Sequence, residues 1–167
     1  MLLPLSNQSE WPAAAAVVAE TVKETLEKDK RYVVRSFSSS DPVGEVAWFL
    51  WNREVGSDTA KKGLRALCET YKADAALSVG IVSYHKALEE APFVGSRSQL
   101  DYRSVWATHL SLKATLWGLR TEQIVWRQER TDRIYHGRTM GPSHRQETAA
   151  RSVVRDLFKT FPVRSDR

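Results

Sequence analysis

Apolar residues recur along this chain at two spacings, one typical of helices and one typical of strands. After Pro12 they return every three or four residues with charged residues between them, which predicts an amphipathic helix. A second helix is expected after Ser57-Asp58, which can act as its N-cap, and a third after Ser143, because Ser143-His144-Arg145-Gln146 matches a capping box. Each helix carries one apolar face, so all three are expected to seal a single layer of extended backbone.

Strand patterns lie between these helices. Five strands are expected, at residues 2–5, 32–37, 74–84, 106–116 and 124–135. The first two flank the first helix and should form a parallel β-α-β unit. Trp106 is a candidate aromatic anchor, but the long strand places it on the same face as Leu110 and Leu112, so it is interpreted as a core residue. Residues 89–103 are interpreted as a polar connection. The predicted fold class is α+β, a mixed sheet of about five strands with helices packed on it.

Length and composition indicate one domain. A chain of 167 residues with 42% hydrophobic and 27% charged residues can bury a core without metal or disulfide, so residues 1–167 are expected to form a single α/β domain. Around residues 38–56 the strand and helix patterns give way to a Trp-rich insertion that contains Trp48, Phe49 and Trp51. Two interpretations stay open: a lid buried over the sheet edge, or an exposed aromatic patch that binds a partner.

Charge and hydropathy narrow the choice of partner and compartment. The formal net charge is +5, but the 25 basic residues are interleaved with 20 acidic ones, so no stripe favours nucleic acid. No apolar run approaches the ~20 residues that a transmembrane helix needs. Met1-Leu2-Leu3-Pro4-Leu5 does not have the form of a signal peptide. The protein is therefore either cytoplasmic or exported by a segment outside this sequence.

Residues that could carry chemistry are scattered. No two of the four histidines, His85, His109, His136 and His144, have the close spacing of a compact metal site. His109 lies near Ser111, but no Gly-x-Ser-x-Gly elbow surrounds any serine, and no glycine-rich phosphate loop is present. The single cysteine, Cys68, lies on an apolar helix face and is interpreted as a buried small hydrophobe. The sequence thus predicts no catalytic residue, metal or cofactor, and not an enzyme.

Binding is expected to come from aromatic anchors and a charged rim. Because tryptophan and arginine often dominate the energy of protein interfaces, the candidate partner-binding residues are Trp48, Phe49, Trp51 and Trp117, with Arg127, Arg130 and Arg133 as the rim.

Three motifs add a resemblance to known proteins. They are Leu2-Leu3-Pro4-Leu5-Ser6-Asn7, Ala73-Asp74-Ala75, and the hairpin from Ala114 through Leu119-Arg120-Thr121 to Trp126. With these motifs and its expected order of strands and helices, the chain resembles a group of bacterial proteins. The group comprises the TolB amino-terminal domain, the LpoB-type activators of penicillin-binding proteins, the periplasmic part of the curli channel CsgG, and outer-membrane lipoproteins of the DUF799 type.

The resemblance implies a function. It is that of a non-catalytic binding or scaffold protein of the bacterial cell envelope, in the periplasm or at the periplasmic face of the outer membrane. The implied partner is a cell-wall synthase, a secretion component or a sister lipoprotein, and a homo-oligomer is compatible with it. The alternative is a cytoplasmic, nucleic-acid-associated basic protein.

Overall fold

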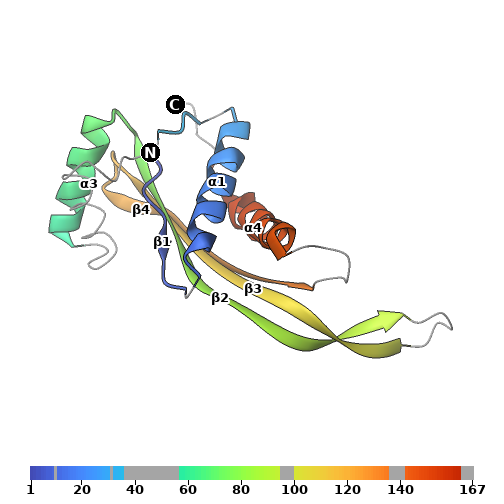
Figure 1. Ribbon diagram of the computed structural model, residues 1–167. Coiled ribbons are helices and arrows are strands. Elements are labelled where there is room, and N and C mark those ends of the chain that lie inside the picture. Colours follow the sequence, from blue (N-terminus) through green and yellow to red (C-terminus); the bar gives the residue numbers. More distant parts are fainter. Residues whose placement is uncertain (10, 31, 36–56, 95–99, 136–141, 163–167) are drawn as a thin grey trace.

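The computed structural model describes residues 1–9, 11–30, 32–35, 57–94, 100–135 and 142–162. Within them, the helices are α1 (Ala13–Lys28), α3 (Asp58–Thr70), α4 (Pro142–Leu157) and the short 3-10 helix η1 (Phe158–Thr160). The strands are β1 (Ser6–Asn7), β2 (Ala75–Val94), β3 (Leu100–Gly118) and β4 (Gln123–Tyr135) (Figure 1). The α+β class and the three predicted helices are confirmed. The Trp-rich segment lies outside the described residues.

The described strands form one mixed sheet in the order β1-β2-β3-β4. β1 pairs with β2 in parallel, whereas β2 with β3 and β3 with β4 are antiparallel. Four strands replace the expected five because residues 32–35 form no strand. The N-terminal segment pairs with β2 instead, through β1 and a bridge from Leu2 to Leu77. Residues 32–35 run beside the N-terminal segment without joining the sheet, and Leu2 N donates a hydrogen bond to Arg35 O at 2.9 Å.

β2 and β3 form a ribbon that is far longer than the sequence predicts. Their register runs without a break in the ladder from Ala75 opposite Gly118 to Val94 opposite Leu100, apart from a bulge between Ile81 and Ser83. The prediction of a polar connection over residues 89–103 is wrong, because only residues 95–99 lie outside the two strands. The polar composition has another cause: this end of the ribbon projects past the described helices, so none of those helices covers either of its faces (Figure 1).

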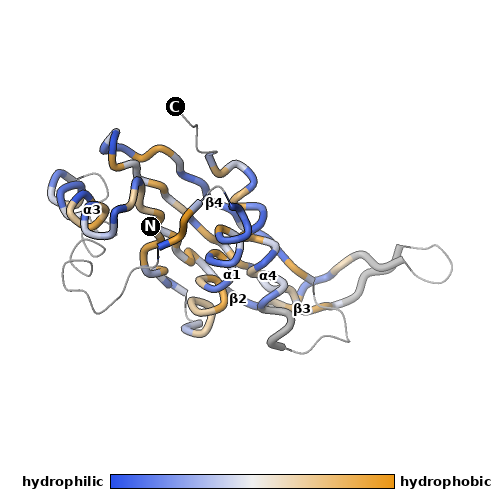
Figure 2. Tube along the Cα trace, turned by 90° about the horizontal axis from the view of Figure 1, so that it is seen from above, coloured by the Kyte–Doolittle hydropathy of each residue, from blue (hydrophilic) through white to orange (hydrophobic). Residues whose placement is uncertain are grey.

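The larger core lies between the sheet and the helices α1 and α4. In Figure 2 these two helices lie over the strands. They bury a contiguous apolar cluster in which Val18 and Val22 of α1 and Val153 and Leu157 of α4 meet the sheet. The sheet contributes Leu77, Val79, Ile81, Leu110, Leu112 and Ala114.

A second, smaller core lies on the other face of the sheet, beneath α3. Ala76 of β2 belongs to it, whereas the next residue, Leu77, belongs to the larger core, and successive strand residues point to opposite faces. Leu64, Leu67 and Cys68 of α3 pack there against Leu3, Ala76 and Trp117. The three helices thus pack on the one layer of strands, α1 and α4 on one face and α3 on the other.

The ends of α3 follow from local chemistry. The Ser57 side chain accepts a hydrogen bond from Ala60 N at 3.2 Å, which confirms the predicted N-cap. At the other end Lys72 adopts a positive φ of 49°, and Ala73 N donates to Cys68 O at 2.8 Å. This left-handed residue turns the chain from the helix into β2.

Candidate functional site

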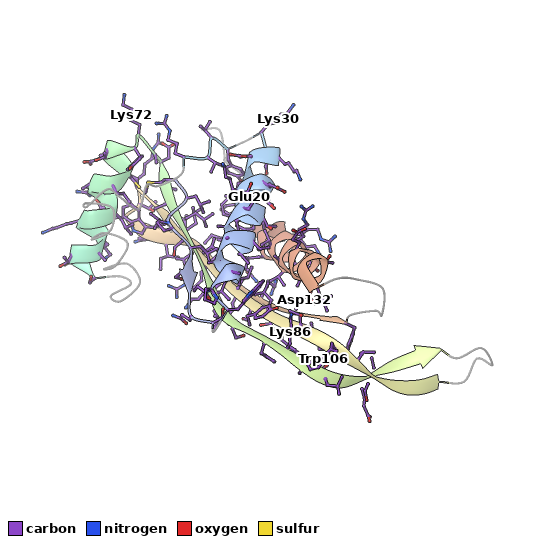
Figure 3. The ribbon with its side chains drawn as sticks, in the orientation of Figure 1. Glu20, Lys30, Lys72, Lys86, Trp106 and Asp132 are labelled. Carbon is purple, nitrogen blue, oxygen red and sulfur yellow. The ribbon has the colours of Figure 1, made fainter. Side chains whose placement is uncertain are left out.

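Two exposed apolar side chains of the ribbon form a cross-strand pair. Leu88 of β2 lies directly opposite Trp106 of β3, and the two side chains are 59% and 53% exposed. Trp106 lies on the face of β3 that also presents Leu110, as predicted, but α1 and α4 do not extend to it. The interpretation of Trp106 as a core residue is therefore wrong (Figure 3).

Polar residues from three strands meet on the opposite face of the same region. Glu89 Oε1 lies 2.5 Å from His109 Nε2, and Glu89 Oε2 lies 3.3 Å from Arg133 Nη1. The His109 ring also stacks on His85, with ring centroids 4.4 Å apart. Glu89 of β2 thus contacts both β3 and β4 where the ribbon leaves the sheet. These contacts stabilise the part of the ribbon that carries Leu88 and Trp106.

These polar contacts do not assemble a nucleophile. His109 is engaged by Glu89, while the Ser111 hydroxyl accepts a hydrogen bond from Thr131 Oγ1 at 2.9 Å. Cys68 is fully buried, as predicted, and burial raises the pKa of its thiol to about 11, which keeps it protonated. In the part of the chain that the structure describes, no group of three or more His, Cys, Asp or Glu side chains could hold a metal ion.

The predicted charged rim is divided between the two faces of β4. Arg127 pairs with Thr115 and Arg133 with His109, so both arginines lie on the face opposite the larger core. Arg130 pairs with Leu112, which places it on the helix-covered face. β4 is an edge strand of the described sheet, so all three remain exposed, and their role in binding stays a prediction.

Among the predicted aromatic anchors, the structure describes only Trp117. Its side chain is 1% exposed and packs under α3, so it is a core residue and cannot contact a partner in this structure. Trp48, Phe49 and Trp51 lie outside the described residues. Trp106 was a candidate anchor that the sequence favoured as a core residue, and Leu88 was not singled out; the structure leaves both side chains exposed.

Comparison with solved structures shows a shared fold at low sequence identity. The lipoprotein GNA1162 from Neisseria meningitidis aligns with a TM-score of 0.51 and 14% identity over 93% of this chain and 94% of that chain. The hypothetical protein CT253 from Chlamydia trachomatis gives 0.57 and 11% over 94% and 88%, respectively. PelC from Paraburkholderia phytofirmans, which forms a dodecamer, gives 0.52 and 13% over 94% and 83%.

The expected likeness to a lipoprotein is thus confirmed for the fold alone, and membership of a TolB-, LpoB-, CsgG- or DUF799-type envelope family stays a prediction. No protein-family model matches the sequence, and no curated protein is significantly similar to it. None of the described helices is long and apolar enough to cross a membrane.

Proposed function

We propose that this protein is a non-catalytic binding module of the bacterial cell envelope, and that it contacts a protein partner through the Leu88–Trp106 pair on the projecting ribbon. The exposed pair is the observation that carries the proposal. The shared fold with GNA1162 supports the envelope setting. The implied location is the periplasm or the periplasmic face of the outer membrane.

The physical basis is that Leu88 and Trp106 expose apolar surface on a stretch of ribbon that the Glu89 contacts hold in place. Burying a Leu or an aromatic side chain is worth roughly 1.5–3 kcal/mol gross, so a partner that covers both residues gains several kcal/mol before its association costs. Tryptophan is also among the residues that most often dominate binding energy. Because the Glu89 contacts hold the base of the ribbon, little ordering is needed when the partner binds.

Charged residues are proposed to guide this contact. Arg130 is the rim candidate on the face that carries Leu88 and Trp106, because it pairs with Leu112. Arg127 and Arg133 lie on the opposite face of β4, where Arg133 is already engaged by Glu89. Rim charges of this kind change the association rate more than the final affinity. Trp48, Phe49 and Trp51 remain proposed anchors as well.

The proposed partner is a cell-wall synthase, a secretion component, a sister lipoprotein or a second copy of this chain. Self-association is included because PelC, which shares the fold, forms a dodecamer.

A photo-crosslinking amino acid placed at Trp106 tests the proposal in intact bacteria. We expect one discrete adduct with an envelope protein, or with the chain itself, after detergent solubilisation. The same amino acid at Arg151, an exposed position on α4, is the control and should give no such adduct. Equal crosslinking from both positions, or recovery of the protein only from cytosol, would contradict the proposal.

The cytoplasmic nucleic-acid alternative gains no support from the charged residues on the sheet face opposite the larger core. Arg127 and Lys113 lie there, but Glu129 pairs with Lys113 and Glu89 with Arg133, so the sign of charge alternates. A nucleic-acid interface needs a continuous basic track along the phosphates. Binding to DNA or RNA that weakens steeply with salt would revive this alternative.

A further inference from the structure

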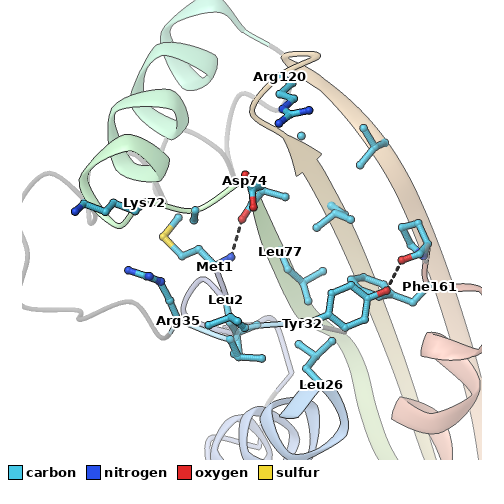
Figure 4. A pocket seen from close by; sticks show the side chains of 18 of the residues that line it. Met1, Leu2, Leu26, Tyr32, Arg35, Lys72, Asp74, Leu77, Arg120 and Phe161 are labelled. Carbon is cyan, nitrogen blue, oxygen red and sulfur yellow. Dashed lines mark hydrogen bonds between the residues drawn. The ribbon is translucent and has the colours of Figure 1, made fainter. Parts of the chain in front are cut away.

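A pocket of about 650 Å³ opens at the end of the sheet opposite the projecting ribbon. Ala75 and Gly118, which pair at this end of β2 and β3, both line it. Its walls come from residues 32–35 after α1, the turn between α3 and β2, the β3–β4 hairpin, and Phe161–Pro162 (Figure 4). The volume lies within the range of about 300–1,000 Å³ that is typical of small-molecule sites.

The pocket has an apolar interior with an apolar entrance. Leu26, Leu77 and Leu116 line it from α1, β2 and β3, and Phe161 lines it from the segment after η1. Two further lining residues, Val33 and Val125, are 82% and 48% exposed. A ligand with a hydrocarbon part would therefore cover apolar surface that is now in contact with water.

Among the described residues that line the pocket, cations outnumber anions. Arg35, Lys72 and Arg120 belong to it from three separate segments, against the single carboxylate of Asp74 (Figure 4). The Arg35 side chain is held in place, because its Nη1 donates to Tyr71 O at 2.9 Å. This excess of positive charge favours a ligand with an anionic group.

Lys72 carries its charge at a backbone position that favours glycine. Its φ of 49° lies in the left-handed region, where the residue that ends a helix is usually glycine. The backbone thus gives no reason for a lysine here, although Lys72 lines the pocket.

The pocket wall formed by residues 32–35 is held to the wall formed by Phe161–Pro162. Tyr32, which precedes Val33, donates a hydrogen bond from its hydroxyl to Pro162 O. Its ring also packs edge-on against Phe161, with centroids 5.3 Å apart. The segment that carries Val33 and Arg35 is therefore joined to the opposite wall, and the pocket is formed before any ligand arrives.

We propose that this pocket binds a single-chain anionic amphiphile, with the hydrocarbon chain along Leu26, Leu77 and Phe161 and the head group among Arg35, Lys72 and Arg120. A neutral apolar ligand would leave the three cations unmatched. A small hydrophilic anion would leave the apolar interior unfilled. This site lies at the other end of the molecule from Leu88 and Trp106, so it can fail or succeed independently of the partner-binding proposal.

Isothermal titration calorimetry of the full chain tests the ligand class with three probes below their micellar concentrations. Laurate carries both the anion and the chain, acetate only the anion, and dodecyltrimethylammonium the chain with the opposite charge. We expect saturable one-to-one binding of laurate only. Equal binding of the cationic amphiphile, binding of acetate as strong as that of laurate, or no binding of laurate would overturn the proposal.

Charge-reversal variants locate the site. Arg120→Glu and Lys72→Glu should each weaken laurate binding roughly tenfold or more, the size of a lost charge-assisted hydrogen bond. Arg151→Glu makes the same charge change on α4, outside the pocket, and is the matched control. Val33→Ser should also weaken binding while melting stays unchanged, since Val33 is exposed. Equal effects of Arg120→Glu and Arg151→Glu would show that laurate binds elsewhere.

Discussion

Trp106 and Leu110 lie on the same face of β3, four residues apart, yet Trp106 is 53% exposed and Leu110 is 2% exposed. The boundary of the helix layer falls between them. We expect Trp106→Ala to change the free energy of unfolding by no more than about 0.5 kcal/mol. Leu110→Ala should cost roughly 2–5 kcal/mol, because it leaves a cavity under α1 and α4. Urea unfolding of the two variants gives the comparison; similar losses would mean that Trp106 is buried in solution.

Trp117 should behave as the centre of the core under α3. Trp117→Ala is expected to destabilise the fold by roughly 3–5 kcal/mol. Trp117→Phe should cost much less, since it keeps a ring and removes an indole N–H that has no hydrogen-bond partner among the described atoms. Chemical denaturation measures both. Ile124→Ala, at a half-exposed position on β4, is the control, and a loss no larger than that of the control would contradict the second core.

The Cys68 thiol should make stability fall at alkaline pH. Burial raises its pKa from 9.0 to about 11 in the folded state. Below pH 9 the thiol is protonated whether the chain is folded or not, so its contribution is constant. Between pH 9 and pH 11 the unfolded chain loses the proton first, and folding becomes less favourable by up to about 3 kcal/mol.

The measurement is the difference in pH dependence between the native sequence and Cys68→Ala. The variant removes this titration while every other group that titrates in the same range stays. Its unfolding free energy should therefore decline less steeply between pH 9 and pH 11. Parallel pH profiles would mean that the thiol ionises normally in the folded protein.

The start of α3 depends on one side chain. Ser57 accepts from Ala60 N, so Ser57→Ala should destabilise the protein by about 1 kcal/mol. Ser57→Asp restores an acceptor at the same position and should recover most of the loss. Thermal melting followed by circular dichroism distinguishes the two variants. If the Ala and Asp variants melted alike, the cap would be broken in solution.

Local patterns predicted the elements better than their packing. The Ser57 cap and the inward face of Leu64, Leu67 and Cys68 were readable because helix spacing shows which side chains share a side. What that spacing cannot show is which face of a sheet a helix will cover. The second core under α3 therefore had no signal in the sequence.

The exposure of Trp106 was predicted wrongly for a related reason. Strand alternation placed Trp106 on the face of Leu110, but it carries no information about where the covering helices end. The pocket was harder still, because Val33, Lys72, Arg120 and Phe161 are far apart in the chain and meet only in the folded structure. The sequence therefore predicts the strands and which side chains share a face, but not which of those side chains the helices leave exposed.

The parallel pairing of Ser6 with Gly80 has a consequence for biosynthesis. Residues 2–8 leave the ribosome before residues 77–81, so their strand partner in β2 is not yet available. The adjacent antiparallel hairpins need only nearby segments, so they can close first, whereas the N-terminal segment must wait and then bridge a long stretch of chain. During that interval the apolar residues Leu2, Leu3 and Leu5 are accessible to chaperones and proteases.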